Sequence, residues 1–187
     1  NCTVVPVVTP MIGMKSLGIK SVTIRTRQAL SGAGWKLLFD AEALSGNVNP
    51  FIPQEEEKLI AELKYLLGID VPVIASCNRV SERDGHFVSV GVELSRETTV
   101  EEVEELMKIP TLGLPSSPKL VNEIIDDSPT RQEYLWNGRG MTTTVGNIRV
   151  EGNIVRYDAL SHNTVRGAAG GVILLAEFAV QESYITK

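Results

Sequence analysis

The sequence has 187 residues, of which 43% are hydrophobic and 22% charged, and its formal net charge is -5. A chain of this composition buries a core rather than staying disordered. Acidic and basic residues interleave without a basic stripe, which argues against nucleic acid or a membrane surface as a partner and favours a small ligand.

The cysteines, histidines and apolar runs narrow the class further. Cys2 and Cys77 are too few for a disulfide framework and indicate a reducing compartment. Two histidines argue against a zinc site. The longest apolar runs, such as 172–175, are too short for a membrane span, and no signal peptide opens the chain. We therefore predict a cytoplasmic protein with no metal site, and from its opening at Asn1 a fragment, a cleaved chain or half of a split protein.

The first part of the chain predicts alternating helices and strands. Residues 4–14 are apolar and predict a helix in which Pro10 causes a kink or an early break. Residues 19–26 alternate apolar and polar positions, which is typical of a half-buried strand, and Gln28 lies at its end. Residues 54–67 show helical spacing behind an acidic first turn, which predicts a helix.

The next segment has the pattern of a β-hairpin. Residues 71–80 and 87–94 predict two strands, and Asp84-Gly85 between them is typical of a hairpin turn. Thr98 is expected to cap a helix over 100–109, with Glu101 completing a capping box.

The remaining elements complete the predicted fold. Further strands are expected over 119–125, 141–150 and 154–160, and a final helix over 163–184. This order predicts an α+β fold, with a mixed, largely antiparallel sheet and helices on one face.

Cys2 is the candidate nucleophile. It stands at the start of the first predicted helix, where free N–H groups and the helix dipole lower a thiol pKa toward the reactive thiolate. The alternative is that a cysteine at this position is incidental.

Arg79 and His86 flank the predicted turn and are expected to share one pocket. A guanidinium suits a carboxylate held through two hydrogen bonds, and an imidazole beside it shuttles a proton near neutral pH. The alternative is a solvated hairpin tip kept polar by its charged residues.

Two further features suit anions. Glu55 and Lys58 are one helical turn apart, so the ammonium is placed for a phosphate, although most such pairs are surface salt bridges. The turn Ser31-Gly32-Ala33-Gly34 lets backbone N–H groups approach an anion, but Leu37 stands where a dinucleotide fingerprint needs its third glycine. The chain is therefore not expected to form a dinucleotide site alone.

Several short strings agree in order and spacing with one family. They are Asn1-Cys2-Thr3, the string from Gln28 to Gly34, the string from Glu55 to Lys58, the string from Cys77 to His86, and the string from His162 to Gly170. Together they resemble aspartate-semialdehyde dehydrogenases, most closely the archaeal and fungal branch. The resemblance spans essentially the whole chain.

The resemblance implies three sets of site residues. The catalytic set is Cys2 as nucleophile, Gln28 as its positioning partner and His86 as acid/base. The substrate-binding set is Arg79 as the clamp on the substrate carboxylate, with Glu55, Lys58 and Asn1. The set on the nicotinamide side of an NADP cofactor is Ser31, Gly32, Gly34 and Asn163.

The resemblance also implies a fold and a reaction. Residues 1–162 would form a glyceraldehyde-3-phosphate-dehydrogenase-like C-terminal catalytic and dimerisation domain, and 163–187 a helix packing on an N-terminal Rossmann domain that this chain lacks. A companion chain would then carry that domain, within a homodimer or homotetramer. The implied reaction is NADP-dependent reductive dephosphorylation of L-aspartyl 4-phosphate, in lysine, threonine and methionine biosynthesis. A malonyl-CoA or succinyl-CoA reductase and a non-catalytic dimerisation fragment remain the alternatives.

Overall fold

A computed structural model describes residues 1–185, and its strands form a single sheet in the order β2-β1-β3-β6-β5-β4. The strands are β1 (Ile19–Gln28), β2 (Val73–Arg79), β3 (His86–Leu94), β4 (Asn122–Ile124), β5 (Thr143–Glu151) and β6 (Ile154–Ser161). β1 pairs with β2 and β4 with β5 in parallel, whereas the other neighbouring strands are antiparallel. The predicted mixed, largely antiparallel sheet is confirmed.

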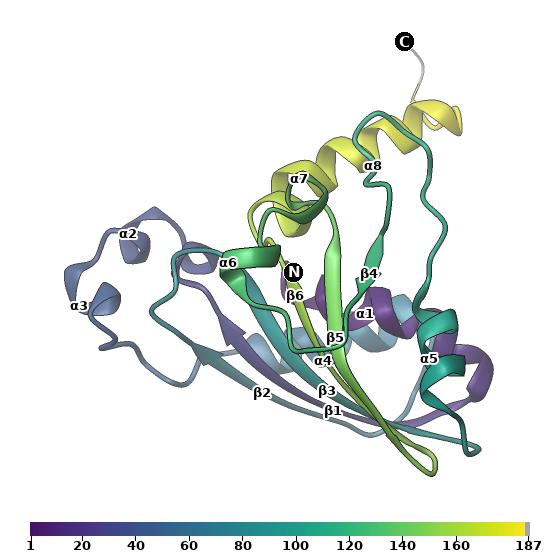
Figure 1. The fold of residues 1–187 in the computed structure, drawn as a ribbon. Helices are drawn as coiled ribbons and strands as arrows, with labels where there is room; N and C mark the ends of the chain where they lie inside the picture. Colours follow the sequence, from purple (N-terminus) through teal and green to yellow (C-terminus); the bar gives the residue numbers. More distant parts are fainter. Residues whose placement is uncertain (186–187) are drawn as a thin grey trace.

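Three helices pack on one face of this sheet (Figure 1). They are α1 (Val4–Met11), α4 (Glu55–Leu67) and α5 (Val100–Met107). Along β1, Val22 and Ile24 are buried beneath these helices, whereas Arg25 and Arg27 on the opposite face are exposed. Alternate side chains of a strand point to opposite faces, so the alternation in the sequence correctly predicts which side chains of β1 face the core and which face the surface.

The remaining helices lie around the edges and one end of the sheet. They are α2 (Trp35–Leu38), α3 (Ala41–Leu44), α6 (Arg131–Tyr134), α7 (Asn137–Gly140) and α8 (Gly170–Gln181), with the 3-10 helices η1 (Gly13–Leu17) and η2 (Leu30–Ala33) and the π-helix η3 (Val165–Ala169). Figure 1 shows α2 and α3 in a small lobe beyond the β2 edge. Within residues 1–185, every helix is too short or too polar to cross a bilayer.

The predicted β-hairpin is wrong in its pairing. β2 and β3 are strands, but β1 lies between them and pairs with both. Alternating apolar residues around Asp84-Gly85 identify two strands and a tight turn. They do not reveal that an earlier strand fills the space between the two, because that depends on contacts distant in sequence.

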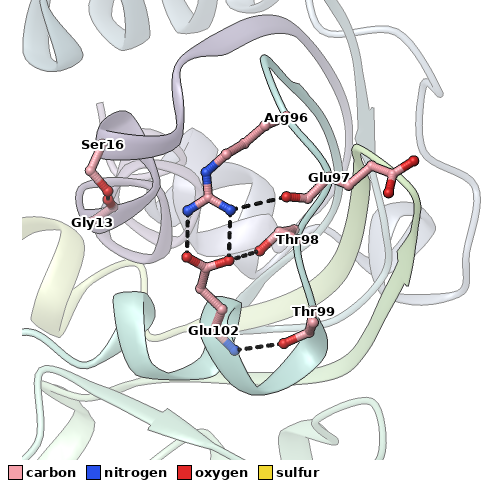
Figure 2. Close-up of polar contacts among 7 residues, drawn as sticks. All are labelled: Gly13, Ser16, Arg96, Glu97, Thr98, Thr99 and Glu102. Carbon is pink, nitrogen blue, oxygen red and sulfur yellow. Dashed lines mark hydrogen bonds and ion pairs between the residues drawn. The ribbon is translucent and has the colours of Figure 1, made fainter.

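One helix end differs slightly from the prediction, and another agrees with it. The cap of α5 is Thr99 rather than Thr98, and its hydroxyl accepts a hydrogen bond from the Glu102 amide. Figure 2 shows that Thr98 instead donates to the Glu102 carboxylate, which Arg96 also binds. The early break expected near Pro10 occurs at Met11, where α1 ends and is followed by η1.

Candidate active site

The ends of three strands meet at one end of the sheet. The parallel register of β1 and β2 sets Gln28 beside Arg79, and the antiparallel register of β1 and β3 sets Arg27 beside Phe87. His86, the first residue of β3, therefore lies close to the end of β1. Arg79 and His86 thus lie close together, although β1 rather than a hairpin places them there. The predicted shared pocket is lined by Arg79 but not by His86, which is buried.

Cys2 contacts His86 directly. The Cys2 Sγ lies 3.3 Å from the His86 Nε2, and the imidazole is 0% exposed. η3 covers the cysteine closely, because a Cβ added at Gly167 would lie 2.5 Å from the Cys2 Cβ. Only a glycine permits this approach. Gly167 is therefore required for packing against Cys2, in addition to any packing of the final helix against another domain.

The prediction of a lowered thiol pKa is wrong for this state of the site. Burial raises the pKa of the Cys2 thiol, and the negative charge of Glu55 raises it further. Burial also lowers the pKa of His86 to about 3, with the positive charges of Arg79 and Arg131 adding to the effect. Desolvation therefore outweighs the dipole of a short helix, and the pair is a neutral thiol facing a neutral imidazole.

Glu55 joins the residues around the cysteine. Its Oε1 accepts hydrogen bonds from the Asn1 Nδ2 at 3.0 Å, the Gln28 Nε2 at 3.1 Å and the Thr3 Oγ1 at 3.2 Å. One carboxylate thus ties the start of α1 to the end of β1 and the first turn of α4. Lys58, one turn later on α4, is exposed and lies outside this network.

Arg79 lies beside the Cys2–His86 pair and borders a pocket. Its Nη1 donates to the Ala29 carbonyl at 2.8 Å, and burial lowers its pKa. A Cβ added at Gly32 would lie 2.8 Å from the His86 Cε1 and 3.0 Å from the Arg79 Nη1. The pocket, of about 390 Å³, is lined by Arg79, Asp40 and Phe51 among others. It opens beside the guanidinium rather than over the thiol.

Asn163 holds two loops of the site together. Its Oδ1 accepts from the Gly85 amide at 2.8 Å, and its Nδ2 donates to the Ser31 Oγ at 2.8 Å. Ser31, Gly32 and Asn163 are therefore close together, as the resemblance implies. Gly34 lies farther along the turn, exposed and at a φ of 90°, with nothing within 4 Å of an added Cβ.

Sequence reasoning missed two contributors to this site, Ala29 and Arg131. The Ala29 amide donates to the His86 Nδ1 at 3.1 Å. The Arg131 side chain donates to the Gly85 carbonyl and to the Arg27 carbonyl, each at 3.2 Å, and so ties the start of β3 to the end of β1. Contacts made by or to backbone groups leave no signature in residue type, so no motif could have identified them.

These features define an α+β domain with a cysteine–histidine site at one end of a mixed sheet. Within residues 1–185, no group of three or more His, Cys, Asp or Glu side chains is arranged to hold a metal. Residues 8–166 match the family model described as semialdehyde dehydrogenase, dimerisation domain, and the chain belongs to that family. The predicted resemblance is confirmed at this level.

Named relatives agree with the family. The chain is 40% identical to an aspartate-semialdehyde dehydrogenase of Archaeoglobus fulgidus, over 99% of this chain and 57% of the relative. A solved aspartate-semialdehyde dehydrogenase with NADP from Candida albicans superposes with a TM-score of 0.80 at 30% identity, covering 99% of this chain and 57% of that one. A malonyl CoA reductase (NADP) of Metallosphaera sedula is 30% identical over 90% of this chain and 53% of the relative. The chain thus spans little more than half the length of these relatives.

Proposed function

We propose that the chain forms the catalytic and dimerisation part of an aspartate-semialdehyde dehydrogenase. The reaction is the reductive dephosphorylation of L-aspartyl 4-phosphate to L-aspartate 4-semialdehyde, in cytoplasmic amino-acid biosynthesis. The observation that carries the proposal is the contact of 3.3 Å between the Cys2 Sγ and the buried His86 Nε2, with Arg79 alongside. The identity of 40% to the Archaeoglobus fulgidus enzyme supports this choice of reaction.

In this reaction Cys2 is the nucleophile. Its sulfur, as the thiolate, attacks the acyl carbon of the substrate and phosphate leaves, so that a thioester joins the aspartyl group to Cys2. NADPH, when bound, supplies the hydride that reduces this thioester. The resulting thiohemiacetal releases the aldehyde and regenerates the thiol. His86 is the group placed to stabilise the reacting atoms through a hydrogen bond from its ring, because it faces the sulfur directly.

Substrate recognition falls to the charged residues around the pair. Arg79 holds the substrate carboxylate through two hydrogen bonds, which a planar guanidinium does better than an ammonium. Asn1 and Glu55 contact the substrate from the start of α1 and α4. Lys58 binds the phosphate, and its exposure leaves the ammonium free to receive it.

The chain fits the nicotinamide end of NADP but not the rest. In the exposed turn from Gly32 to Gly34, Gly32 adjoins the His86 ring that faces the sulfur, and Asn163 donates to the neighbouring Ser31 hydroxyl. The 187 residues contain no G-x-G-x-x-G fingerprint. We therefore assign these residues to the nicotinamide side only, and a nucleotide-binding domain or companion chain holds the remainder.

Two exposed surfaces suit the partners that this assignment needs. Val172, Ile173 and Leu175 on α8 are 66%, 54% and 63% exposed, so this helix would pack on the nucleotide-binding domain, while 1–162 form the catalytic domain. The predicted segment is 163–187, of which 186 and 187 lie outside the described residues. The helix-free face of the sheet, with Arg25 and Arg27, would pack against a second copy in a dimer or tetramer. The dimerisation-domain family supports this assembly.

The assay is reduction of NADP by the full-length protein with L-aspartate semialdehyde and phosphate. The proposal expects turnover that depends on phosphate. Replacing phosphate with CoA tests the second candidate, which the similarity to the Metallosphaera sedula enzyme supports. Turnover with CoA alone would assign the chain to an acyl-CoA reductase. No turnover from folded protein under either condition would leave the non-catalytic dimerisation fragment.

A further inference from the structure

We propose that the backbone amide of Ala29 fixes His86 as a neutral imidazole with its proton on Nε2. The ring then acts on the Cys2 sulfur as a hydrogen-bond donor and not as the base that removes the thiol proton. Ala29 is on this account a positioning residue that works through its backbone. The mechanistic consequence rests on the proposed function, whereas the position of the proton does not.

The contact at Nδ1 determines the tautomer. The Ala29 N–H points at the His86 Nδ1 over 3.1 Å, and an amide N–H can only donate. The Nδ1 must therefore present a lone pair. A neutral imidazole carries one proton on its two nitrogens, so that proton is on Nε2, which faces the Cys2 Sγ at 3.3 Å.

The peptide that carries this amide is held rigidly. The carbonyl of Gln28, on the same peptide plane, accepts from the Val80 amide at 2.9 Å. The carbonyl of Ala29 accepts from the Arg79 Nη1 at 2.8 Å. Turning the Ala29 amide away from the imidazole would break the first bond, because the amide and that carbonyl belong to one planar unit.

The surroundings disfavour the alternative protonation states. A proton on Nδ1 would face the Ala29 N–H head on. A hydrogen bond to the Gly85 backbone favours a protonated ring, but burial and the charges of Arg79 and Arg131 outweigh it and lower the pKa of His86. A second proton on the ring would be buried beside the positive charges of Arg79 and Arg131. The neutral Nε2-protonated ring is the state that keeps the Ala29 N–H paired and directs a donor at the Cys2 sulfur.

This tautomer changes what His86 contributes. Its Nε2–H stabilises a thiolate on Cys2, and it stabilises the oxyanion formed when the substrate carbonyl is attacked. A neutral imidazole serves catalysis as a donor of this kind in other enzymes. Because Nε2 already bears a proton, the proton of the Cys2 thiol passes to the departing phosphate, as the C–S bond forms and the C–O bond to phosphate breaks.

Nitrogen NMR of full-length protein labelled with ring-15N histidine tests the tautomer directly. The His86 signals are those lost in His86→Gln. We expect an unprotonated nitrogen at Nδ1 and a protonated one at Nε2 at neutral pH, and the same pattern in Cys2→Ala, because Ala29 rather than the sulfur sets it. A proton on Nδ1, a doubly protonated ring, or a pattern that reverses in Cys2→Ala would overturn the proposal.

Two substitutions test the consequence. Glutamine at position 86 can accept from Ala29 through its carbonyl and donate to the sulfur through its amide, but it cannot take up a proton. We expect His86→Ala to lower kcat by about 100-fold or more, the usual loss for one such donor, and His86→Gln to recover most of that loss. Equal losses in both variants would show that proton uptake is required and would refute the donor role. If the wild type shows no turnover, the proposed function fails while the NMR result still decides the tautomer.

Discussion

The two ends of the sheet use the same residue types for different purposes. At the end where β1 stops and β3 begins, Glu55 and Arg79 lie around a buried thiol and imidazole. At the opposite end, Arg96 and Glu102 form an ion pair (Figure 2). The pair is 2.5 Å long, and both side chains are substantially exposed.

Burial decides the difference between these ends. At the exposed end water screens the charges of Arg96 and Glu102, so the pair stabilises the start of α5 only weakly. At the buried end the same charges shift the pKa values of Cys2 and His86. Substitutions at the exposed end should therefore change stability in acid, and substitutions at the buried end should change turnover.

The largest effect is expected at Cys2. Cys2→Ala should lower turnover by roughly 10⁴-fold or more, as loss of a nucleophile does. Circular dichroism should show an unchanged fold. Cys77→Ala is the matched control: burial raises the pKa of the Cys77 thiol to about 11, which suits a core residue. It should keep normal turnover and cost about 1 kcal/mol of stability. Full activity in Cys2→Ala would show that Cys2 is not the nucleophile.

The second effect is steric. Gly32→Ala would place a Cβ 2.8 Å from the His86 Cε1 and 3.0 Å from the Arg79 Nη1, so one of these groups must move. We expect kcat/KM to fall by roughly 100-fold, the usual result of a displacement near 1 Å. Ala61→Ser, at an exposed position of α4 away from the pocket, is the control and should change kcat/KM little. Equal kinetics in the two variants would mean that substrate does not use this surface.

A smaller effect is expected from Arg79→Lys. The ammonium keeps the charge but loses the planar fork, so the KM for L-aspartate semialdehyde should rise by about tenfold while kcat changes less. Steady-state kinetics over a range of semialdehyde concentrations measure the two separately. An unchanged KM would count against Arg79 as the carboxylate clamp.

The smallest effect is expected at the exposed end. Arg96 holds the pKa of Glu102 at about 2, and Thr98 adds to the effect. A lowered folded-state pKa stabilises the fold at pH above the ordinary carboxyl pKa, and this contribution disappears as the pH falls through about 2. Urea unfolding at pH 5 and at pH 2 should therefore show a smaller acid loss in Glu102→Gln than in the wild type, with turnover unchanged near neutral pH. An identical acid loss would show that the pair contributes nothing.

Much of the fold could be predicted from local patterns. The alternation over 19–26 and the helical spacing over 54–67 identified β1 and α4, because each element buries one face against the same core. The strand order could not be predicted, since it depends on β1 lying between β2 and β3.

The site was predicted in its residue types but not in its electrostatics. Cys2, Arg79 and His86 are together, as expected. The direction of the thiol pKa shift was wrong because burial and the charge of Glu55 are properties of the folded chain. The role of Ala29 was invisible for a similar reason, because only its backbone takes part.

The central claim is that Cys2 carries the acyl group. The direct test is to mix full-length protein with L-aspartyl 4-phosphate without NADPH, quench in acid, and locate any added mass by peptide mass spectrometry. We predict an aspartyl group on the peptide containing Cys2, removed by hydroxylamine as a thioester is. An aspartyl group on Cys77 instead, or none on Cys2 in protein that turns over, would contradict the account.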